Sequence, residues 1–294
     1  MEGSFRLKIF SIVCKLIRLN HVWQLEGEKL KNEILKKQKK INPPVIKKKL
    51  KIEEMKVGNY KTYIIIPKNG NNGKLILYIH GGGYVLPITS LHWNFISWIC
   101  MQTNSKIIVP FYPLVPENCV DDVMNQLLLV YKKLIENKSY SKLSFIGDSA
   151  GGDITLTFTL YLKKLGLREP DCVIAISPAT SVDFDEVESE KAIKNDYILG
   201  FPALKQIGEW YSSKYGVKHW MVSSLNGDLN NLNTKVTIFS STYDITNINA
   251  NKFWIKNKDL ICYHEYDKLP HIYPLLSFLP ESKDARRIIK EILN

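Results

Sequence analysis

The chain has 294 residues, a length that suits one large α/β domain. Its hydrophobic share of 45% and charged share of 23% are those of a packed globular protein, which excludes a disordered or collagen-like chain. No apolar stretch reaches the roughly 20 residues that a membrane-spanning helix needs. The five scattered cysteines contain no Cys-x-x-Cys pair, so we expect neither disulfides nor a zinc site, and a reducing, cytoplasmic location.

The net charge of +11 is concentrated near the N-terminus. Residues 1–60 hold fifteen Lys or Arg against six Asp or Glu, a net +9, and the remaining residues add only +2. Only five of the 40 basic residues are Arg, the side chain best suited to phosphates and base edges, so we expect no nucleic-acid partner. The basic segment is then a solvated lysine-rich surface or, alternatively, a region attracted to an anionic membrane surface.

Residues 5–19 have the pattern of an amphipathic helix. One apolar stripe recurs at steps of four and three residues, in Phe5, Ile9, Ile12, Leu16 and Leu19. We expect this stripe to pack on the rest of the protein, and a helix lying in a membrane interface, with weak peripheral contact, is the alternative. A second basic helix is expected from Glu26 to about Lys40, before the helix-breaking pair Pro43-Pro44.

From residue 45 onward, strands alternate with helices. The first two expected strands are Leu50–Val57, which alternates apolar and polar residues, and Tyr60–Ile66, which is rich in β-branched residues. Six continuously apolar runs follow, as in parallel strands buried on both faces: Leu75–Ile79, Lys106–Val109, Leu143–Ile146, Val173–Ile176, Val236–Phe239 and Leu260–Tyr263. Eight strands in this order predict an α/β protein with a doubly wound, mostly parallel sheet.

The motif Gly147-Asp148-Ser149-Ala150-Gly151-Gly152 directly follows one of these strands. It fits a G-x-S-x-G turn from strand to helix, in which strained backbone lifts a serine hydroxyl clear of the sheet and small residues must flank it. A helix from Ile154 to Leu165 follows, as such a turn requires. Ser149 is therefore the candidate nucleophile.

A second glycine motif, His80-Gly81-Gly82-Gly83-Tyr84, also follows an expected strand. Consecutive glycines let backbone N–H groups approach a ligand, and in acyl transfer such donors stabilise negative charge on the substrate carbonyl oxygen. We expect the amides of Gly82, Gly83 and Ala150 to form this oxyanion hole. Gly81 would mainly shape the turn. A phosphate-binding loop, the rival interpretation, would need a Gly-Lys-Ser/Thr ending or G-x-G-x-x-G spacing, and neither is present.

A serine nucleophile needs a base, and the base needs an orienting acid. Around a nucleophile turn of this kind, the acid and then the histidine follow the serine along the chain. Asp244 comes just after the expected strand Val236–Phe239. His271 follows the last strand by a short loop. We therefore expect Asp244 and His271 to complete a catalytic triad with Ser149.

Four more side chains fit these roles less well. His219 precedes the last two strands and stands too early, and His264 lies within or at the end of the last strand. Asp148 adjoins the serine and is expected to point elsewhere, which leaves Asp267 as the reserve acid.

Taken together, the motifs resemble the hormone-sensitive-lipase branch of the α/β-hydrolase fold, whose members are carboxylesterases. The resemblance rests on HGGGY and GDSAGG, with YDIT and LPHIYP downstream, and covers about residues 45–294. It implies an α/β-hydrolase core and a helical cap over the site, built from residues 1–44 and from about 185–225.

Three residues depart from the pattern of that family. Pro113 stands where the family usually has Arg, Asp153 where Asn is common, and Ser241 where a glycine usually precedes the acid. None of these changes removes a member of the triad.

The resemblance implies a serine carboxylesterase that acts on small acetyl-like esters, up to about hexanoyl, without cofactor or metal. Tyr84, Trp93 and Phe111 are candidates to line its pocket, although core packing accounts for them equally well. The alternatives are a non-catalytic small-ligand-binding protein on the same fold and a lipase acting at membrane surfaces. A homodimer formed through a C-terminal strand edge or helix is also compatible with the sequence.

Overall fold

The computed structural model describes residues 3–40, 44, 50–68, 70, 72–136, 138–184 and 194–294. Eight strands form one sheet: β1 (Leu50–Val57), β2 (Tyr60–Pro67), β3 (Lys74–Ile79), β4 (Lys106–Pro110), β5 (Lys142–Asp148), β6 (Cys172–Ile176), β7 (Lys235–Ser241) and β8 (Ile261–Tyr266). Their spatial order is β1-β2-β4-β3-β5-β6-β7-β8. Strand β2 is antiparallel to both of its neighbours, β1 and β4, and the other five neighbouring pairs are parallel. The mostly parallel eight-stranded sheet predicted from the sequence is confirmed.

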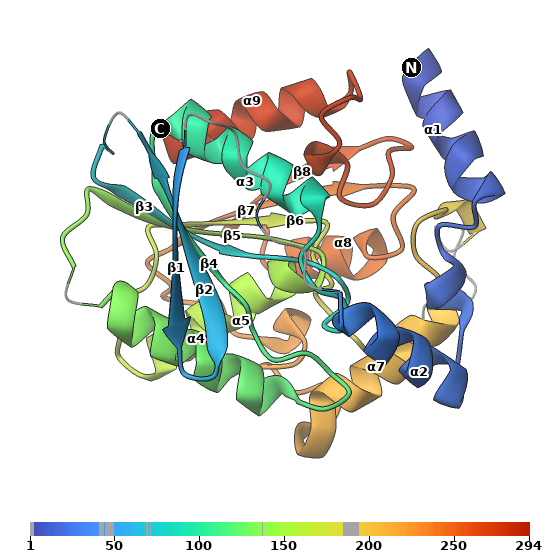
Figure 1. Ribbon diagram of the computed structural model, residues 1–294, viewed down its shortest axis with the longest axis horizontal. Coiled ribbons are helices and arrows are strands. Elements are labelled where there is room, and N and C mark those ends of the chain that lie inside the picture. The colour runs from blue at the N-terminus through green and yellow to red at the C-terminus, as the bar shows by residue number, and fades with distance from the viewer. Residues whose placement is uncertain are drawn as a thin grey trace.

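Helices cover both faces of the sheet (Figure 1). One face carries α3 (Ser90–Thr103) and α9 (Ser282–Leu293). The other carries α4 (Val120–Leu134), α5 (Ala150–Lys164) and α8 (Asn247–Lys256). Because both faces are covered, each central strand contributes to two cores: Leu75 and Leu77 of β3 belong to the core under α4 and α5, and Ile76 and Tyr78 to the core under α3 and α9. This two-sided burial explains the continuously apolar runs.

Three further elements pack near the loop that follows β3: α2 (Gly27–Gln38), α7 (Phe201–Ser212) and the 3-10 turn η1 (His21–Gln24). The 3-10 turn η3 (Ser224–Asn226) packs against α5 and α8. The Gln38 amide donates to the carbonyl oxygens of Val85 and Val115, at 2.9 and 2.7 Å. Tyr211 of α7 stacks on Tyr84, with ring centroids 4.0 Å apart. Helices α2 and α7 therefore lie over the glycine-rich loop, whereas residues 185–193 of the expected second cap segment fall outside the described residues.

Helix α1 (Phe5–Leu16) packs differently from the sequence prediction, which was wrong about its inward face. The stripe expected to pack inward is exposed, with Phe5 at 78% and Leu16 at 76%. Leu7 and Cys14 on the opposite side are buried, and Phe10 packs against the core near α9. The helix carries apolar side chains on two opposite sides. Sequence periodicity reveals such stripes, but it does not show which of the two faces the protein.

None of the helices in the described ranges has both the length and the apolar content needed to cross a membrane. All five cysteines are free thiols, and Cys14, Cys100 and Cys172 are buried.

Candidate active site

Ser149 occupies the sharp turn between β5 and α5. Its backbone has φ 53° and ψ −124°, a strained conformation for a residue other than glycine. A Cβ atom on Gly147 would overlap the backbone of Gly151, and one on Gly151 would overlap the carbonyl oxygen of Ile79. The turn is held by a 2.8 Å hydrogen bond from the Ser149 amide to the carbonyl oxygen of Ile176. The G-x-S-x-G glycines are thus required by close backbone packing.

The three predicted triad side chains meet at this turn. Nε2 of His271 lies 2.8 Å from Oγ of Ser149, and Nδ1 lies 2.9 Å from Oδ2 of Asp244. All three residues are buried. The structure therefore brings together a hydroxyl, an imidazole and a carboxylate in the order that nucleophilic catalysis by serine requires.

Asp244 is held in place by the residues that follow it. The backbone amide and the hydroxyl of Thr246 both donate to its Oδ1, at 2.9 and 2.7 Å. Burial alone would raise the pKa of Asp244, but the His271 charge and these hydrogen bonds outweigh burial and lower it. For His271, burial lowers the pKa, and the Asp244 carboxylate outweighs burial and raises it. The acid is therefore ionised and favours a proton on the ring when the serine gives one up.

Asp196, which the sequence analysis did not single out, lies beside this pair. Its Oδ2 accepts the backbone N–H of Ile245, the residue after Asp244, at 3.0 Å. Its Oδ1 accepts two backbone N–H groups of its own segment. Burial and the Asp244 charge raise the pKa of Asp196, and its own charge acts with that of Asp244 to raise the pKa of His271. No motif marks this residue, so only the folded arrangement reveals it.

Two serines hold the loop that carries His271. Oγ of Ser241 donates to the carbonyl oxygen of Leu269 and accepts its N–H, both at 2.8 Å. Oγ of Ser177 accepts the N–H of Ile272 at 3.0 Å. Ser241 is the residue that replaces the usual family glycine, and its hydroxyl ties the end of β7 to the histidine loop. Ser177 was missed because it belongs to no recognised motif.

The glycine loop presents backbone amides near the serine. Gly82 and Gly83 have φ values of 124° and 59°, which glycine adopts without strain. Within the described part of the chain, their amides donate to no protein acceptor. Ala150 is the first residue of α5, so its amide is one of the N–H groups that a helix leaves without an intrahelical partner. A Cβ on Gly81 would collide with Asp148, so this glycine is needed for close packing.

Asp148 points away from His271, as expected. Its Oδ1 accepts the Tyr78 hydroxyl at 2.5 Å, and its Oδ2 lies 3.1 Å from Nε2 of His92. Burial would raise the pKa of Asp148, but His92 and the Tyr78 hydroxyl outweigh burial and lower it. This buried hydrogen-bond network fixes Asp148, the residue before the nucleophile, and so helps to hold the turn in place.

His264, His219 and Asp267 lie apart from the triad. His264 belongs to β8 and stacks on Phe239, with ring centroids 4.9 Å apart. His219 stacks on Tyr215 at 4.5 Å. Asp267 is exposed and accepts a hydrogen bond from Thr242. No group of three or more potential metal ligands is assembled anywhere in the described ranges.

The three pocket candidates are largely engaged in packing. Trp93 is fully buried and meets Tyr63 edge to face, with ring centroids 5.6 Å apart. Phe111 packs on the same tyrosine at 5.3 Å. The hydroxyl of Tyr84 donates to Asp153 at 3.2 Å. Trp93 and Phe111 therefore pack in the core, and Tyr84 is held by a buried hydrogen bond.

Asp153 is a buried carboxyl one helical turn after the nucleophile. Its Oδ1 accepts the backbone N–H of Ser224 at 3.1 Å, and its Oδ2 accepts the Tyr84 hydroxyl. Burial raises its pKa to about 7, despite these two hydrogen bonds. The residue that replaces the usual family asparagine therefore links α5 to η3 and to the glycine loop.

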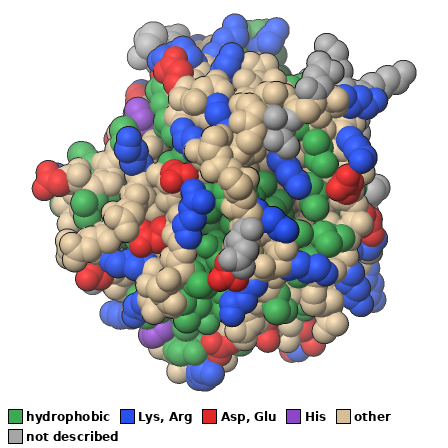
Figure 2. All heavy atoms as spheres, turned by 90° about the vertical axis from the view of Figure 1, so that its left-hand side faces the viewer, with side chains coloured by type: hydrophobic (Ala, Val, Ile, Leu, Met, Phe, Trp, Pro, Cys, Tyr) green, Lys and Arg blue, Asp and Glu red, His purple; other side chains and the backbone are tan. Residues whose placement is uncertain are grey.

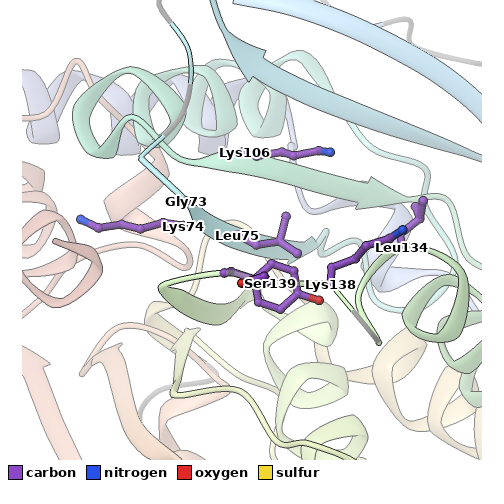
Figure 3. Close-up of a pocket in the computed structure, with 8 residues that line it drawn as sticks. Gly73, Lys74, Leu75, Lys106, Leu134, Lys138 and Ser139 are labelled. Atoms are coloured by element: carbon purple, nitrogen blue, oxygen red, sulfur yellow. The ribbon is translucent and has the colours of Figure 1, made fainter.

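Two cavities lie on opposite sides of the molecule. One of about 810 Å³ separates α1 from the loops that carry the triad, and Leu7, Tyr243 and Leu269 help to line it. Another, of about 290 Å³, lies at the amino ends of β3 and β4, next to Lys74 and Lys106 (Figure 3). Because the triad sits at the carboxyl ends of the strands, the smaller cavity is remote from it.

Figure 2 looks onto the left-hand side of Figure 1, where basic side chains alternate with acidic and apolar ones.

A profile described as the alpha/beta hydrolase fold matches residues 76–275. The chain belongs to this family. The α/β-hydrolase is 29% identical over 161 residues to a triacylglycerol lipase of Mycobacterium tuberculosis, covering 54% of this chain and 32% of that protein. It is 24% identical over 143 residues to hormone-sensitive lipase of Bos taurus, covering 47% of this chain and 19% of that protein. The chain thus spans a third or less of the length of these two relatives.

The solved structures agree with the fold. An esterase from the bacterial hormone-sensitive lipase family superimposes on this α/β-hydrolase with a TM-score of 0.80 and 19% identity, covering 100% of this chain and 98% of that one. The family predicted from the two glycine motifs, the hormone-sensitive-lipase-like α/β-hydrolases, is confirmed.

Proposed function

We propose that this α/β-hydrolase is a serine carboxylesterase that hydrolyses short-chain acyl esters. The observation that carries the proposal is the row of hydrogen bonds through the triad. The His271 ring lies 2.9 Å from the Asp244 carboxylate and 2.8 Å from the Ser149 hydroxyl. Hydrolysis of esters is also the activity that the names of its lipase and esterase relatives state. The proposed substrate is a small-molecule ester, and the proposed location of the enzyme is the cytoplasm.

In the first half of the reaction, Oγ of Ser149 attacks the ester carbonyl carbon while Nε2 of His271 takes the hydroxyl proton. The oxyanion that forms accepts hydrogen bonds from the amides of Gly82, Gly83 and Ala150. When the tetrahedral intermediate collapses, the bond to the alcohol breaks and His271 gives its proton to the departing oxygen. The acyl group remains on the serine.

In the second half, water attacks the acyl-enzyme and His271 takes its proton. Collapse of the second tetrahedral intermediate releases the carboxylic acid and returns the proton to Ser149. Asp244 keeps the ring oriented and stabilises its charged form in both halves. Asp196 is a positioning residue, because it touches the backbone beside Asp244 and no reacting atom.

We further propose that residues 1–44 and the inserted segment of about 185–225 form a cap over the rest of the core, which spans residues 45–294. Support comes from Trp23 of η1, whose ring would lie 2.7 Å from a Cβ atom on Gly83, and from the stack of Tyr211 on Tyr84. Bulky rings this close to the glycine loop leave little room for a long chain, which favours short acyl groups.

The test is hydrolysis of p-nitrophenyl acetate and butyrate by the purified protein. Ser149→Ala should lose more than about 10³-fold of the rate, because the residual catalysis comes only from binding and the oxyanion hole. Ser97→Ala is the matched control, since Ser97 is a buried serine on α3 whose hydroxyl has no partner in the described structure, and it should keep the rate. An active Ser149→Ala protein would end the proposal.

A fluorophosphonate probe separates the esterase from a non-catalytic binding protein on the same fold. The esterase should be labelled at Ser149, and Ser149→Ala should not be labelled. Absence of labelling on a correctly folded protein would favour the binding protein.

A further inference from the structure

The outward side of α1 is an apolar surface without a protein partner in the described structure. This surface, here called the outer face of α1, consists of five exposed side chains: Phe5, Ile9, Ile12, Val13 and Leu16. Seven of the thirteen large apolar side chains exposed in the described residues lie between residues 5 and 19. Exposed apolar side chains are normally scattered singly, so such a concentration indicates an interaction surface.

The inner side of the same helix already packs on the protein. Leu7 and Cys14 are buried there, and Phe10 meets Phe278 with ring centroids 5.2 Å apart. Helix α1 lies at the outer edge of the molecule (Figure 1), and Phe278, itself exposed, extends the apolar area beside it. The outer face is therefore left over after the helix has found its place in the fold.

The charges around the outer face identify its occupant. At 100° per residue, Arg6 lies on one flank of the apolar stripe and Lys8 and Lys15 on the other, and all three are exposed. Residues 3–25 contain four basic residues and no Asp or Glu. An apolar stripe between two basic flanks matches the headgroup region of an anionic leaflet, where acyl chains take up the stripe and phosphates pair with the flanks.

A second copy of the chain fits this surface less well. Pairing two outer faces would place the basic residues of one helix against those of the other, and α1 itself contains no Asp or Glu to compensate. Like charges brought together at an interface oppose association.

We propose that the outer face of α1 docks this protein peripherally on an anionic lipid surface. The proposal goes beyond the esterase function and does not rest on it. Docking of this kind is reversible, because a single amphipathic helix lying in the interface buries a limited apolar area.

The test is co-sedimentation of the full-length protein with vesicles of phosphatidylcholine, either pure or containing about 30% phosphatidylglycerol, at about 0.1 M salt. We expect binding to the anionic vesicles that weakens as salt is raised. The double variant Ile12→Ser with Leu16→Ser should bind about tenfold or more less tightly, because two apolar side chains no longer enter the interface. The matched control is Leu129→Ser with Ile255→Ser, which removes two similarly exposed apolar side chains on α4 and α8.

A second double variant, Lys8→Gln with Lys15→Gln, tests the contribution of charge. It should also bind the anionic vesicles about tenfold or more less tightly, since each basic residue near an anionic leaflet raises the binding constant roughly fivefold. Lys29→Gln with Lys36→Gln on α2 removes the same charge elsewhere and should bind as the parent does. Thermal unfolding of every variant checks the fold independently of esterase activity, so loss of that activity does not bear on the result.

Three outcomes would overturn the proposal. The first is a parent protein that binds neither kind of vesicle, and the second is equal binding by the α1 variants and their controls. The third is a concentration-dependent dimer in sedimentation velocity that Ile12→Ser with Leu16→Ser abolishes, because it would identify a second copy as the occupant.

Discussion

His271 sets the pH dependence of the proposed reaction, because its ring must be neutral to accept the proton of Ser149. Burial lowers the pKa of this ring, but Asp244, with a further contribution from Asp196, outweighs burial and raises it above the ordinary value of 6.5. A raised pKa means that the ring becomes protonated, and inactive as a base, sooner as the pH falls. The acid limb of kcat/KM should therefore lie above the position of an ordinary histidine.

Asp196→Asn tests this electrostatic account. The change removes one negative charge beside the ring, so the pKa of His271 should fall and the acid limb of kcat/KM should move to lower pH. A full pH profile with a p-nitrophenyl ester measures the shift, and Asp228→Asn, at an exposed and remote carboxylate, should leave the limb in place. An acid limb that moves upward, or one unchanged in a folded variant, contradicts the role given to Asp196.

Among individual residues, the sequence predicts those that lie in a local motif or at a strand end in the expected chain order. Ser149 has its glycine turn, and Asp244 and His271 follow strand ends in the required order. Asp196 and Ser177 carry no such mark, because their roles come from backbone groups that only folding brings near. The same holds for Ser241, which the sequence showed as a departure and the structure shows as a clamp on the histidine loop.

Helix α5 positions the nucleophile and carries its own pH-dependent element, Asp153. Its pKa of about 7 in the folded protein lies far above the ordinary 3.8 of an exposed aspartate. Between these values the folded state binds a proton that the unfolded state has released, so stability falls as the pH rises, by up to about 1.4 kcal/mol per pH unit. The loss begins near pH 4 and is complete slightly above pH 7.

Asp153→Asn should remove this pH dependence. Asn can still accept the N–H of Ser224 and pair with the Tyr84 hydroxyl, and it carries no charge to bury. The variant should therefore match the parent in thermal unfolding near pH 4 and exceed it in Tm near pH 8. Because other groups titrate in both proteins, the difference between the two curves is the relevant quantity. A variant that is less stable at pH 8 would mean that the charged carboxylate is favourable where it lies.

Elements buried on two sides were the most predictable part of the fold. All eight strands overlap the segments that their apolar runs or alternation indicated. The central strands β3 to β7 were the clearest, because a strand between two helix layers must be apolar along its length. The orientation of α1 was not predictable in this way. Its amphipathic pattern contains two apolar stripes, and which one packs depends on partners such as Phe278 that lie far away in the sequence.

On the scale of the whole molecule, the N-terminal 40 residues serve two different parts of the structure. Residues 21–38 reach the glycine loop, through Trp23 at Gly83 and Gln38 at Val85. Helix α1 instead contacts the other end of the chain, where the Ser4 amide donates to Glu281 at 2.6 Å, and Tyr197, whose ring meets that of Phe10 edge to face at 6.1 Å. The cap expected from residues 1–44 is therefore divided, and only its second half adjoins the proposed oxyanion hole.

Deleting residues 1–19 should separate these two roles. The deletion removes the burial of Leu7 and Cys14 and part of that of Phe10, so Tm should fall by roughly 5–10 °C. Hydrolysis of a soluble short-chain ester should stay within roughly fivefold of the parent, because no residue of α1 touches the triad. Trp23→Ala is the contrasting variant, and displacement of the loop it supports should cost on the order of 10–100-fold in rate. If the deletion abolished activity in a protein that still unfolds cooperatively, α1 would be an essential part of the cap over the active site.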